Sequence, residues 1–178
     1  SFVDVIKISA PYGIQNTIEK LNEKGFEAFL VGGCVRDSLM GRIPSDWDIA
    51  TNALPTDIHS IFDKTFDTGL KHGTVTVMTQ DGSCEITTFR LDKGYSDYRH
   101  PDGVEFTSNL EKDLSRRDFT INALAYNSEQ GIIDLFSGVR DIKEGIIRTV
   151  GDPLMRFNED ALRMLRALRF SAQLGFLI

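Results

Sequence analysis

The sequence predicts a mixed α/β fold in which helices flank a sheet. Short apolar or alternating runs rich in β-branched residues are typical of strands, and the segments between them have helical spacing. The stretch 29–50, FLVGGCVRDSLMGRIPSDWDIA, combines a strand, a two-glycine turn, a helix and a second strand. With 178 residues the chain can bury one proper core, so we expect one domain, or one domain with an attached piece.

The N-terminal part predicts an amphipathic helix over 13–24, followed by a buried strand at 29–31. Gly32-Gly33 forms a turn without side chains, and residues 35–40 resume with helical spacing. Backbone N–H groups at a strand-to-helix turn can approach phosphate oxygens, and Arg36 can add a planar cationic fork. The turn therefore indicates a phosphate cradle, although a two-glycine turn alone is also compatible with an ordinary tight turn.

Two carboxylates stand at the start of the next expected strand, 46–49. Asp46 and Asp48 are two residues apart, and side chains two apart on a strand point to the same face. The pair repels itself unless a cation lies between its members, and oxygen ligands near phosphates suit Mg²⁺. Taken alone, the pair is also compatible with a solvated strand end. Together with the glycine turn it predicts a nucleotide–metal site.

Further along, Thr56 is a plausible N-cap for a helix over 57–62. Residues 73–79 and 84–90 read as two strands of a hairpin, and Glu85 on the second is a candidate third carboxylate or a solvated surface residue. The following segment, 91–105, is polar and contains glycine and proline. It is too long for a hairpin turn, so we expect a mobile functional loop or a disordered insertion.

The segment 113–125 contains paired arginines and an aspartate before a helix-like apolar pattern. Arg116 and Arg117 are compatible with a solvated basic pair on a capped surface helix. Residues 132–136 predict a short strand, and 138–145 predict a turn-rich connection.

A C-terminal helix is expected from Arg156 onward. At 100° per residue its two sides differ in character. One side is charged and contains Glu159, Asp160, Arg163, Arg166 and Arg169, and the other contains Phe157, Ala161, Met164, Leu165 and Leu168. The charged side is either a salt-bridged outer face or a row of arginines that faces the carboxylates, where it would suit a triphosphate or RNA.

The net charge of −6 argues against a surface that coats nucleic acid, but it allows a local basic site. Residues 140–178 contain seven Lys and Arg against five Asp and Glu, so we expect a polyanion to bind in this part of the chain. Two cysteines predict free thiols in a reducing compartment. The sequence has no apolar run close to the roughly 20 residues of a membrane-spanning helix, so we expect a cytoplasmic protein.

Four separated motifs occur in a fixed order along the chain. They are Gly32-Gly33-x-Val35-Arg36-Asp37, Asp46-Trp47-Asp48, Arg116-Arg117-Asp118-Phe119-Thr120-Ile121-Asn122-Ala123, and Glu159-Asp160-x-x-Arg163-x-x-Arg166-x-x-Arg169-Phe170. In this combination the sequence resembles the class II tRNA nucleotidyltransferases, the CCA-adding enzymes of bacteria and eukaryotes, together with bacterial poly(A) polymerases. The resemblance implies a polymerase-β-like head, with a mixed sheet flanked by helices, followed by an all-α neck. We expect the head at 1–150 and a truncated start of the neck at 151–178, so that the regions gripping the rest of the tRNA are largely absent.

The resemblance also implies roles for particular residues in the head. The catalytic positions are acidic, namely Asp46, Asp48 and Glu85. The two aspartates would hold Mg²⁺, and Glu85 would be a third acidic group. The positions that would bind the nucleotide phosphates are Gly33, Arg36 and Arg117. In the neck, Asp160 and Arg163 would read the base, and Arg166 and Arg169 would complete the nucleotide-side surface.

The function implied is template-independent transfer of CMP and AMP from CTP and ATP to the 3′ end of tRNA, with release of pyrophosphate. The motifs are shared with bacterial poly(A) polymerases and with enzymes that add only CC or only A, and the long segment 91–105 disfavours the CC-only kind. A catalytically silent RNA- or nucleotide-binding module is an alternative of another class, which the intact Asp46, Asp48 and Arg117 disfavour. A dinucleotide-binding oxidoreductase is weaker still, because Gly32-Gly33 lacks the spaced third glycine of that fingerprint.

Overall fold

The computed structural model describes residues 6–69, 73–91, 105–153 and 161–178. Its elements in chain order are α1 (Tyr12–Glu23), β1 (Ala28–Val31), α2 (Gly33–Leu39), β2 (Asp48–Thr51), α3 (Pro55–Ile61), β3 (Thr65–Gly69), β4 (Thr74–Thr79), β5 (Gly82–Thr88), α4 (Leu110–Ser115), the 3₁₀ turn η3 (Thr120–Asn122), β6 (Leu124–Asn127), β7 (Gly131–Asp134), α5 (Gly138–Glu144) and α7 (Ala161–Leu174).

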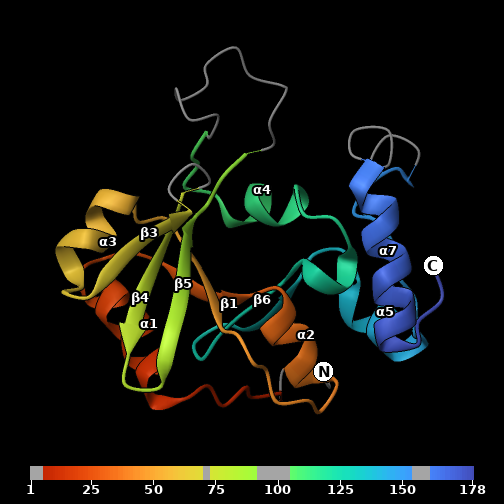
Figure 1. Cartoon of the computed structure of the whole chain (residues 1–178), viewed down its shortest axis with the longest axis horizontal. Helices are drawn as coiled ribbons and strands as arrows, with labels where there is room; N and C mark the ends of the chain where they lie inside the picture. Colours follow the sequence, from red (N-terminus) through yellow and green to blue (C-terminus); the bar gives the residue numbers. More distant parts are fainter. Residues whose placement is uncertain (1–5, 70–72, 92–104, 154–160) are drawn as a thin grey trace.

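The strands form one mixed sheet in the order β3-β4-β5-β2-β1-β6-β7 (Figure 1). Neighbouring strands are antiparallel except for β2 and β5, which are parallel. The parallel pair arises because the chain leaves β2, forms α3, β3 and β4, and then returns as β5 beside β2. The predicted mixed sheet with flanking helices is therefore confirmed.

One face of the sheet is covered by helices α1, α2 and α3. Each contributes side chains that are at most 1% exposed, including Ile14, Val35 and Ile58. Alternate strand residues point to the same layer, so Ile49 of β2 and Ile86 of β5 are buried there. This layer is the main core, and it holds β2 and β5 rigidly from one side.

The opposite face carries a smaller core. It includes Phe29 and Ala50 from the sheet, Phe89 just after β5, and Leu114 from α4. The rings of Phe29 and Phe89 lie 6.3 Å apart in a tilted arrangement. Because α4 is short, it covers only part of this face.

A third core attaches α7 to the segment around η3. Ala167 and Leu174 of α7 pack with Phe119 and Ile121, and the ring of Phe170 meets that of Phe119 edge-on at 5.9 Å. The apolar side chains on the other side of α7 are more than half exposed, namely Leu162, Met164, Leu165 and Leu168. The helix therefore packs on the rest of the structure through its mixed side, and its leucine-rich side faces outward.

The strand–turn–helix–strand unit and the hairpin of β4 and β5 are confirmed, but the predicted start of β2 is two residues early. Asp46 lies in a bend, and the strand begins at Asp48. Thr56 is not an N-cap either, because Pro55 takes the first helical position and Leu54 precedes it. The Leu54 N–H donates to the carboxylate of Asp57 at 2.9 Å, which secures that helix end.

Two other predictions of local structure are wrong. The segment 113–125 is not one helical pattern, because α4 ends at Ser115 and the chain continues as η3 and then β6. Phe119, Ile121 and Leu124 are fully buried, and continuous burial looks alike for a strand and for a helix in a short apolar run. Residues 138–144 form the helix α5, which Gly145 ends at φ 68°, instead of a turn-rich connection.

The predicted loop at 91–105 lies mostly outside the described residues, as do Asp160 and the start of the expected C-terminal helix. Within the part of the chain that the structure describes, no helix has the length and apolar character needed to cross a bilayer.

Candidate active site

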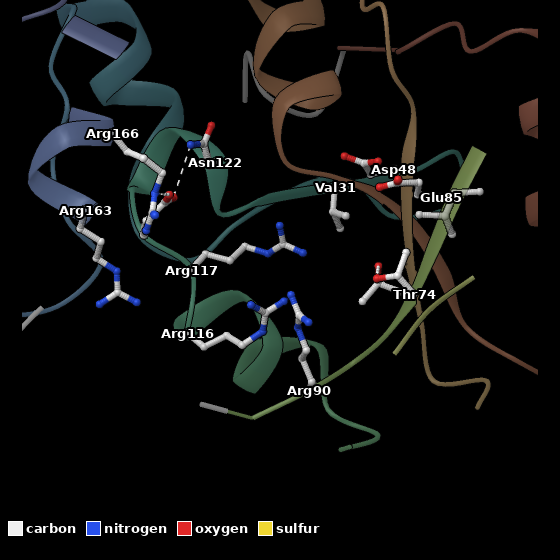
Figure 2. A pocket seen from close by; sticks show the side chains of 13 residues that line it. Val31, Asp48, Thr74, Glu85, Arg90, Arg116, Arg117, Asn122, Arg163 and Arg166 are labelled. Carbon is white, nitrogen blue, oxygen red and sulfur yellow. Dashed lines mark hydrogen bonds and ion pairs between the residues drawn. The ribbon is translucent and has the colours of Figure 1, made fainter. Parts of the chain in front are cut away.

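A cavity of about 360 Å³ opens on the sheet face that α4 only partly covers. Side-chain alternation explains its position: Ile49 and Ile86 point to the helical layer, so their neighbours Asp48 and Glu85 point to the opposite side. The cavity is lined by the sheet, by the segment after α4 and by α7 (Figure 2). Its lining residues are Val31, Asp48, Ile49, Thr74, Glu85, Thr87, Arg90, Arg116, Arg117, Asp118, Asn122, Arg163 and Arg166.

The carboxylates that meet in the cavity come from neighbouring parallel strands. Asp48 of β2 and Glu85 of β5 are register partners, and their side chains lie next to each other (Figure 2). Asp46 is exposed in the bend before β2 and does not line the cavity, although its charge reaches Asp48. The structure therefore pairs Asp48 with Glu85 directly, with Asp46 as the outer member.

Burial, followed by the neighbouring charge of Glu85, raises the pKa of Asp48 to about 6, while Arg117 acts in the opposite direction. Among the described residues no side chain or backbone group donates a hydrogen bond to the Asp48 carboxylate. The two adjacent carboxylates repel each other, and a cation between them would relieve that repulsion.

These carboxylates fit a hard divalent cation. Mg²⁺ takes oxygen ligands, usually one or two carboxylates, and fills its other positions with water and substrate phosphates. In the described part of the chain, no three or more His, Cys, Asp and Glu side chains are grouped so that they could hold a metal ion, so Asp46, Asp48 and Glu85 do not form such a trio. A site with few protein ligands is thus compatible with Mg²⁺ that arrives with a phosphate ligand.

The opposite wall of the cavity is cationic. Arg116 and Arg117 leave the end of α4 and both bind Asp113, at 3.3 Å and 3.2 Å, through their Nη2 atoms. Asp113 is 1% exposed and also accepts the backbone N–H of Arg90 at 3.0 Å. One buried carboxylate therefore binds two guanidinium groups and the backbone of a third arginine.

Helix α7 supplies the third wall. Arg163 is only 9% exposed, and Arg166 donates from Nε to Asp118 at 3.2 Å. Both line the cavity, so the helix turns its arginine side to the carboxylates (Figure 2). A purely solvated outer face is wrong for these two arginines. Arg169, by contrast, is exposed and stacks on Phe170 at 5.3 Å.

The glycine turn lies beside the cavity. Gly32 has φ 75°, a conformation that favours glycine, and a Cβ there would lie 3.4 Å from Nη1 of Arg117. Gly33 begins α2, and Arg36 turns away to bind Asp37 at 3.1 Å and Asn122 at 2.6 Å. Arg36 also lies 5.4 Å from the ring centroid of Phe170. In this structure Arg36 connects α2 to α7 and does not line the cavity.

The predicted residues thus fall into three groups. Those brought together in the cavity are Asp48, Glu85, Arg117, Arg163 and Arg166, and those that do not line it are Gly33, Arg36, Asp46 and Arg169. Asp160 lies outside the described residues.

Sequence reasoning missed the buried organiser Asp113 and the lining residue Arg90. Asp113 precedes the arginine pair by three and four residues, a spacing that brings side chains together on a helix and could have identified it. No local pattern marks Arg90, because it meets the other arginines only through tertiary structure.

Comparison with known proteins gives a consistent result. The family described as Poly A polymerase head domain matches residues 28–148. A CCA-adding enzyme of Leuconostoc mesenteroides subsp. mesenteroides is 55% identical over 162 residues, which are 91% of this chain and 40% of that protein. The chain therefore spans about 40% of the length of this curated relative.

Solved structures that are similar to this chain are likewise CCA-adding enzymes or tRNA nucleotidyltransferases. The crystal structure of the Bacillus stearothermophilus CCA-adding enzyme in complex with CTP is similar with a TM-score of 0.86 and 47% identity, over 96% of this chain and 41% of that one. A tRNA nucleotidyltransferase complexed with a primer tRNA and an incoming ATP analogue is similar with a TM-score of 0.71 and 32% identity, over 90% of this chain and 46% of that one.

Proposed function

This chain belongs to the Poly A polymerase head-domain family, and on that basis we propose that it is the catalytic head, with the start of the neck, of a tRNA nucleotidyltransferase. The head would correspond to 1–150 and the start of the neck to 151–178. The reaction is template-independent transfer of CMP and AMP from CTP and ATP to the 3′ end of tRNA, with release of pyrophosphate. We infer a cytoplasmic location, which a tRNA substrate would support.

One observation carries the proposal: paired carboxylates without internal donors face a wall of arginines across one cavity. Five arginines and three carboxylates line the cavity, a surplus of two positive charges in a chain whose net charge is −6. A nucleoside triphosphate with a divalent cation matches both walls, because its phosphates are anionic and its metal is cationic.

We assign Mg²⁺ to Asp48 and Asp46, with Glu85 beside them as the third acidic group. When bound there, Mg²⁺ lowers the pKa of the attacking 3′ hydroxyl and neutralises charge that develops on the transferred phosphoryl group. The contribution of the chain is to fix Asp48 and Glu85 on neighbouring strands, because the helical core packs behind β2 and β5, while Asp46 would approach from the bend before β2.

We assign the phosphates of the nucleotide to Arg117 and to the glycine turn at Gly33, with Arg36 behind that turn. Arg117 is held by Asp113 and lies next to Gly32, so its guanidinium can bind a phosphate oxygen without first losing side-chain freedom. Arg166 and Arg169 are assigned to the nucleotide-side surface of α7.

We assign base choice to Asp160 and Arg163. Cytosine and adenine both present an amino donor beside a ring-nitrogen acceptor, and a carboxylate with a guanidinium complements that order. Uracil and guanine present the reverse order, which would set acceptor against acceptor and donor against donor. One protein pair can therefore admit C and A and reject U and G without a nucleic-acid template.

A poly(A) polymerase is the second candidate, because the matching family is described by that activity. CC-only and A-only addition are narrower forms of the leading reaction. The deciding experiment supplies the protein and Mg²⁺ with tRNAs that end before CCA, after C, or after CC, and with one labelled nucleotide at a time. We expect CMP, CMP and AMP to be incorporated on the three acceptors in turn.

Repeated AMP addition to an unrelated RNA 3′ end would favour the poly(A) polymerase instead. Incorporation of only CMP or only AMP would select one of the partial activities. Binding of nucleotides or RNA without incorporation of either would favour a silent binding module and refute the leading proposal.

A further inference from the structure

Two threonine hydroxyls lie on the sheet beside the carboxylates of the cavity. Thr74 of β4 and Thr87 of β5 are register partners, and their Oγ1 atoms are 2.9 Å apart. Both residues line the cavity together with Asp48 and Glu85, and Figure 2 shows Thr74 on the side of these carboxylates that faces away from α2. Among the described residues that line the cavity, only these two carry a hydroxyl group.

This hydroxyl pair keeps hydrogen-bonding capacity for a ligand. A threonine hydroxyl has one donor hydrogen and two acceptor lone pairs. The bond between Thr74 and Thr87 uses one hydrogen and one lone pair, whichever of them donates. Among the described residues neither hydroxyl has another hydrogen-bond partner, so one donor hydrogen and several lone pairs remain. A neutral group that both donates and accepts, such as another hydroxyl, would match this pair.

The position of the hydroxyl pair in the sheet separates it from the glycine turn. Thr87 pairs with Ala50, two residues beyond the pair of Asp48 and Glu85. Strand β1 is antiparallel to β2 and ends at the glycine turn, so this step along β2 leads away from that turn. In addition, β4 and β1 lie on opposite sides of β5 and β2. The threonines are therefore displaced from the glycine turn both along the strands and across the sheet.

The direction of the reaction indicates which substrate meets the threonines. Under the proposed function, the glycine turn and Arg117 bind the phosphates of the nucleotide. In an in-line displacement the attacking hydroxyl and the leaving pyrophosphate lie on opposite sides of the transferred phosphorus, so the acceptor RNA approaches from the side away from the glycine turn. Its 3′ hydroxyl must lie at Asp48 and Glu85. Two residues of a strand span about 7 Å, which leaves room for one sugar ring between the carboxylates and the threonines.

We propose that Thr74 and Thr87 bind the 2′ hydroxyl of the terminal ribose of the acceptor, and so select an RNA end over a DNA end. This assignment rests on the proposed function. The 2′ and 3′ hydroxyls of a ribose are on adjacent carbons, so a 3′ hydroxyl at the carboxylates brings the 2′ hydroxyl close to the polar groups beside them. The 2′ hydroxyl both donates and accepts hydrogen bonds, and it distinguishes RNA from DNA. The threonine pair can do both in return.

The test measures kcat/KM for CMP addition to two tRNAs that end before CCA, one with a ribose and one with a 2′-deoxyribose on the terminal nucleotide. We expect the unaltered protein to prefer the ribose acceptor by about threefold to tenfold, as one neutral hydrogen bond would provide. Thr74→Val and Thr87→Val remove a hydroxyl but keep a β-branched side chain that suits a strand. Each should lose most of the preference through a lower kcat/KM on the ribose acceptor, with little change on the 2′-deoxyribose acceptor.

Two control variants separate the loss of the hydroxyl from other effects. Thr87→Ser keeps the hydroxyl and should retain the ribose preference, whereas a role in packing alone would not be restored by serine. Thr65→Val is the matched control, because Thr65 lies on β3 of the same sheet, its Oγ1 is 2.7 Å from Nδ1 of His59, and it does not line the cavity. It should leave the preference unchanged. In every variant the ratio of CTP to dCTP use should also stay unchanged, since this ratio reports the sugar of the incoming nucleotide.

Equal kcat/KM of the unaltered protein on the two acceptors, or a ribose preference that both valine variants retain, would overturn the assignment. A change confined to the ratio of CTP to dCTP use would also overturn it, because the hydroxyl pair would then bind the incoming nucleotide. CMP is still added in each of these cases, so the proposed function would stand. Failure of the unaltered protein to extend any tRNA would instead remove the proposed function, and this inference with it.

Discussion

Replacement of Asp48 by Asn separates the catalytic value of this carboxylate from its effect on stability. The Asp48 carboxylate accepts no hydrogen bond from the described residues, and burial with Glu85 raises its pKa from 3.8 to about 6. Without a metal, the charged form of Asp48 therefore destabilises the folded state. Asp48→Asn removes the charge at nearly constant shape, so the metal-free variant should be more stable at neutral pH.

The size of the effect follows from linkage. A rise of about 2 in pKa corresponds to about 3 kcal/mol, and contact with solvent in the open cavity reduces this to about 1–2 kcal/mol. Because the folded state has the higher pKa, it holds the proton in a range where the unfolded chain has lost it. Stability should therefore fall as the pH rises from about 4 to about 6, and the loss should persist at higher pH.

The assay is urea denaturation in EDTA between pH 4 and pH 7. Asp48→Asn should match the unaltered protein near pH 4 and exceed it by about 1–2 kcal/mol at pH 7. Asp141→Asn is the matched control, because the carboxylate of Asp141 is buried but accepts hydrogen bonds from Thr120 at 2.6 Å and from Arg148 at 3.3 Å. That variant should lose stability.

Mg²⁺ provides the second half of the test. It should stabilise the unaltered protein by about 1.4 kcal/mol at ten times its Kd, and it should stabilise Asp48→Asn much less. Nucleotide transfer should be lost in Asp48→Asn, as in Asp48→Ala and Asp46→Ala. A loss of stability at pH 7 without metal, or near-normal transfer, would refute the reasoning.

Four further predictions concern other parts of the chain. Asp113→Ala should lower the free energy of unfolding by about 3–5 kcal/mol, because it removes the buried carboxylate that binds the partly buried guanidinium groups of Arg116 and Arg117, and a change below about 1 kcal/mol in urea denaturation would contradict this. Phe170→Ala should cost about 3–5 kcal/mol and should lower hydrogen-exchange protection in α7 more than in the sheet; equal loss in both would argue against a local docking role. Arg163→Ala should relax the preference for C and A in incorporation assays with all four nucleotides, whereas an unchanged preference would remove its role in base choice. Shortening the segment 91–105 should reduce AMP addition more than CMP addition, because we expect that segment to move between the two nucleotides, and equal losses would count against such movement.

Those parts of the fold with regular periodicity could be predicted from the sequence. The strand before Gly32, the helix after it and the hairpin that carries Glu85 each have a local signature, in apolar spacing or turn residues. The start of β2 was harder to predict, because Asp46 and Asp48 fit a strand equally well on spacing alone. Only the pairing of β2 with β5 selects Asp48 as the residue that faces Glu85.

The remaining parts depend on tertiary structure. Residues 119–125 are buried except for Asn122, and their apolar positions carry no period that would distinguish η3 and β6 from a helix. For α7, amphipathicity identifies two sides but not which side meets the head. The shape of Phe119 and the charge of Asp118 decide this, because they accept Phe170 and Arg166 from the mixed side of the helix.

The positive and negative side chains of the cavity differ in how the protein holds them. Its arginines are held by protein carboxylates, Arg116 and Arg117 by Asp113 and Arg166 by Asp118, so the cationic wall has a fixed geometry. The Asp48 carboxylate accepts no hydrogen bond from the described residues, and its raised pKa shows that its charged form is unfavourable there. A free triphosphate would be attracted by the arginines but repelled by Asp48 and Glu85. A free cation would be attracted by these two carboxylates but repelled by the arginines. Under the proposed function, a cation bound to a triphosphate would satisfy both walls at once, so the electrostatics of the cavity would favour the metal–nucleotide complex over either component alone.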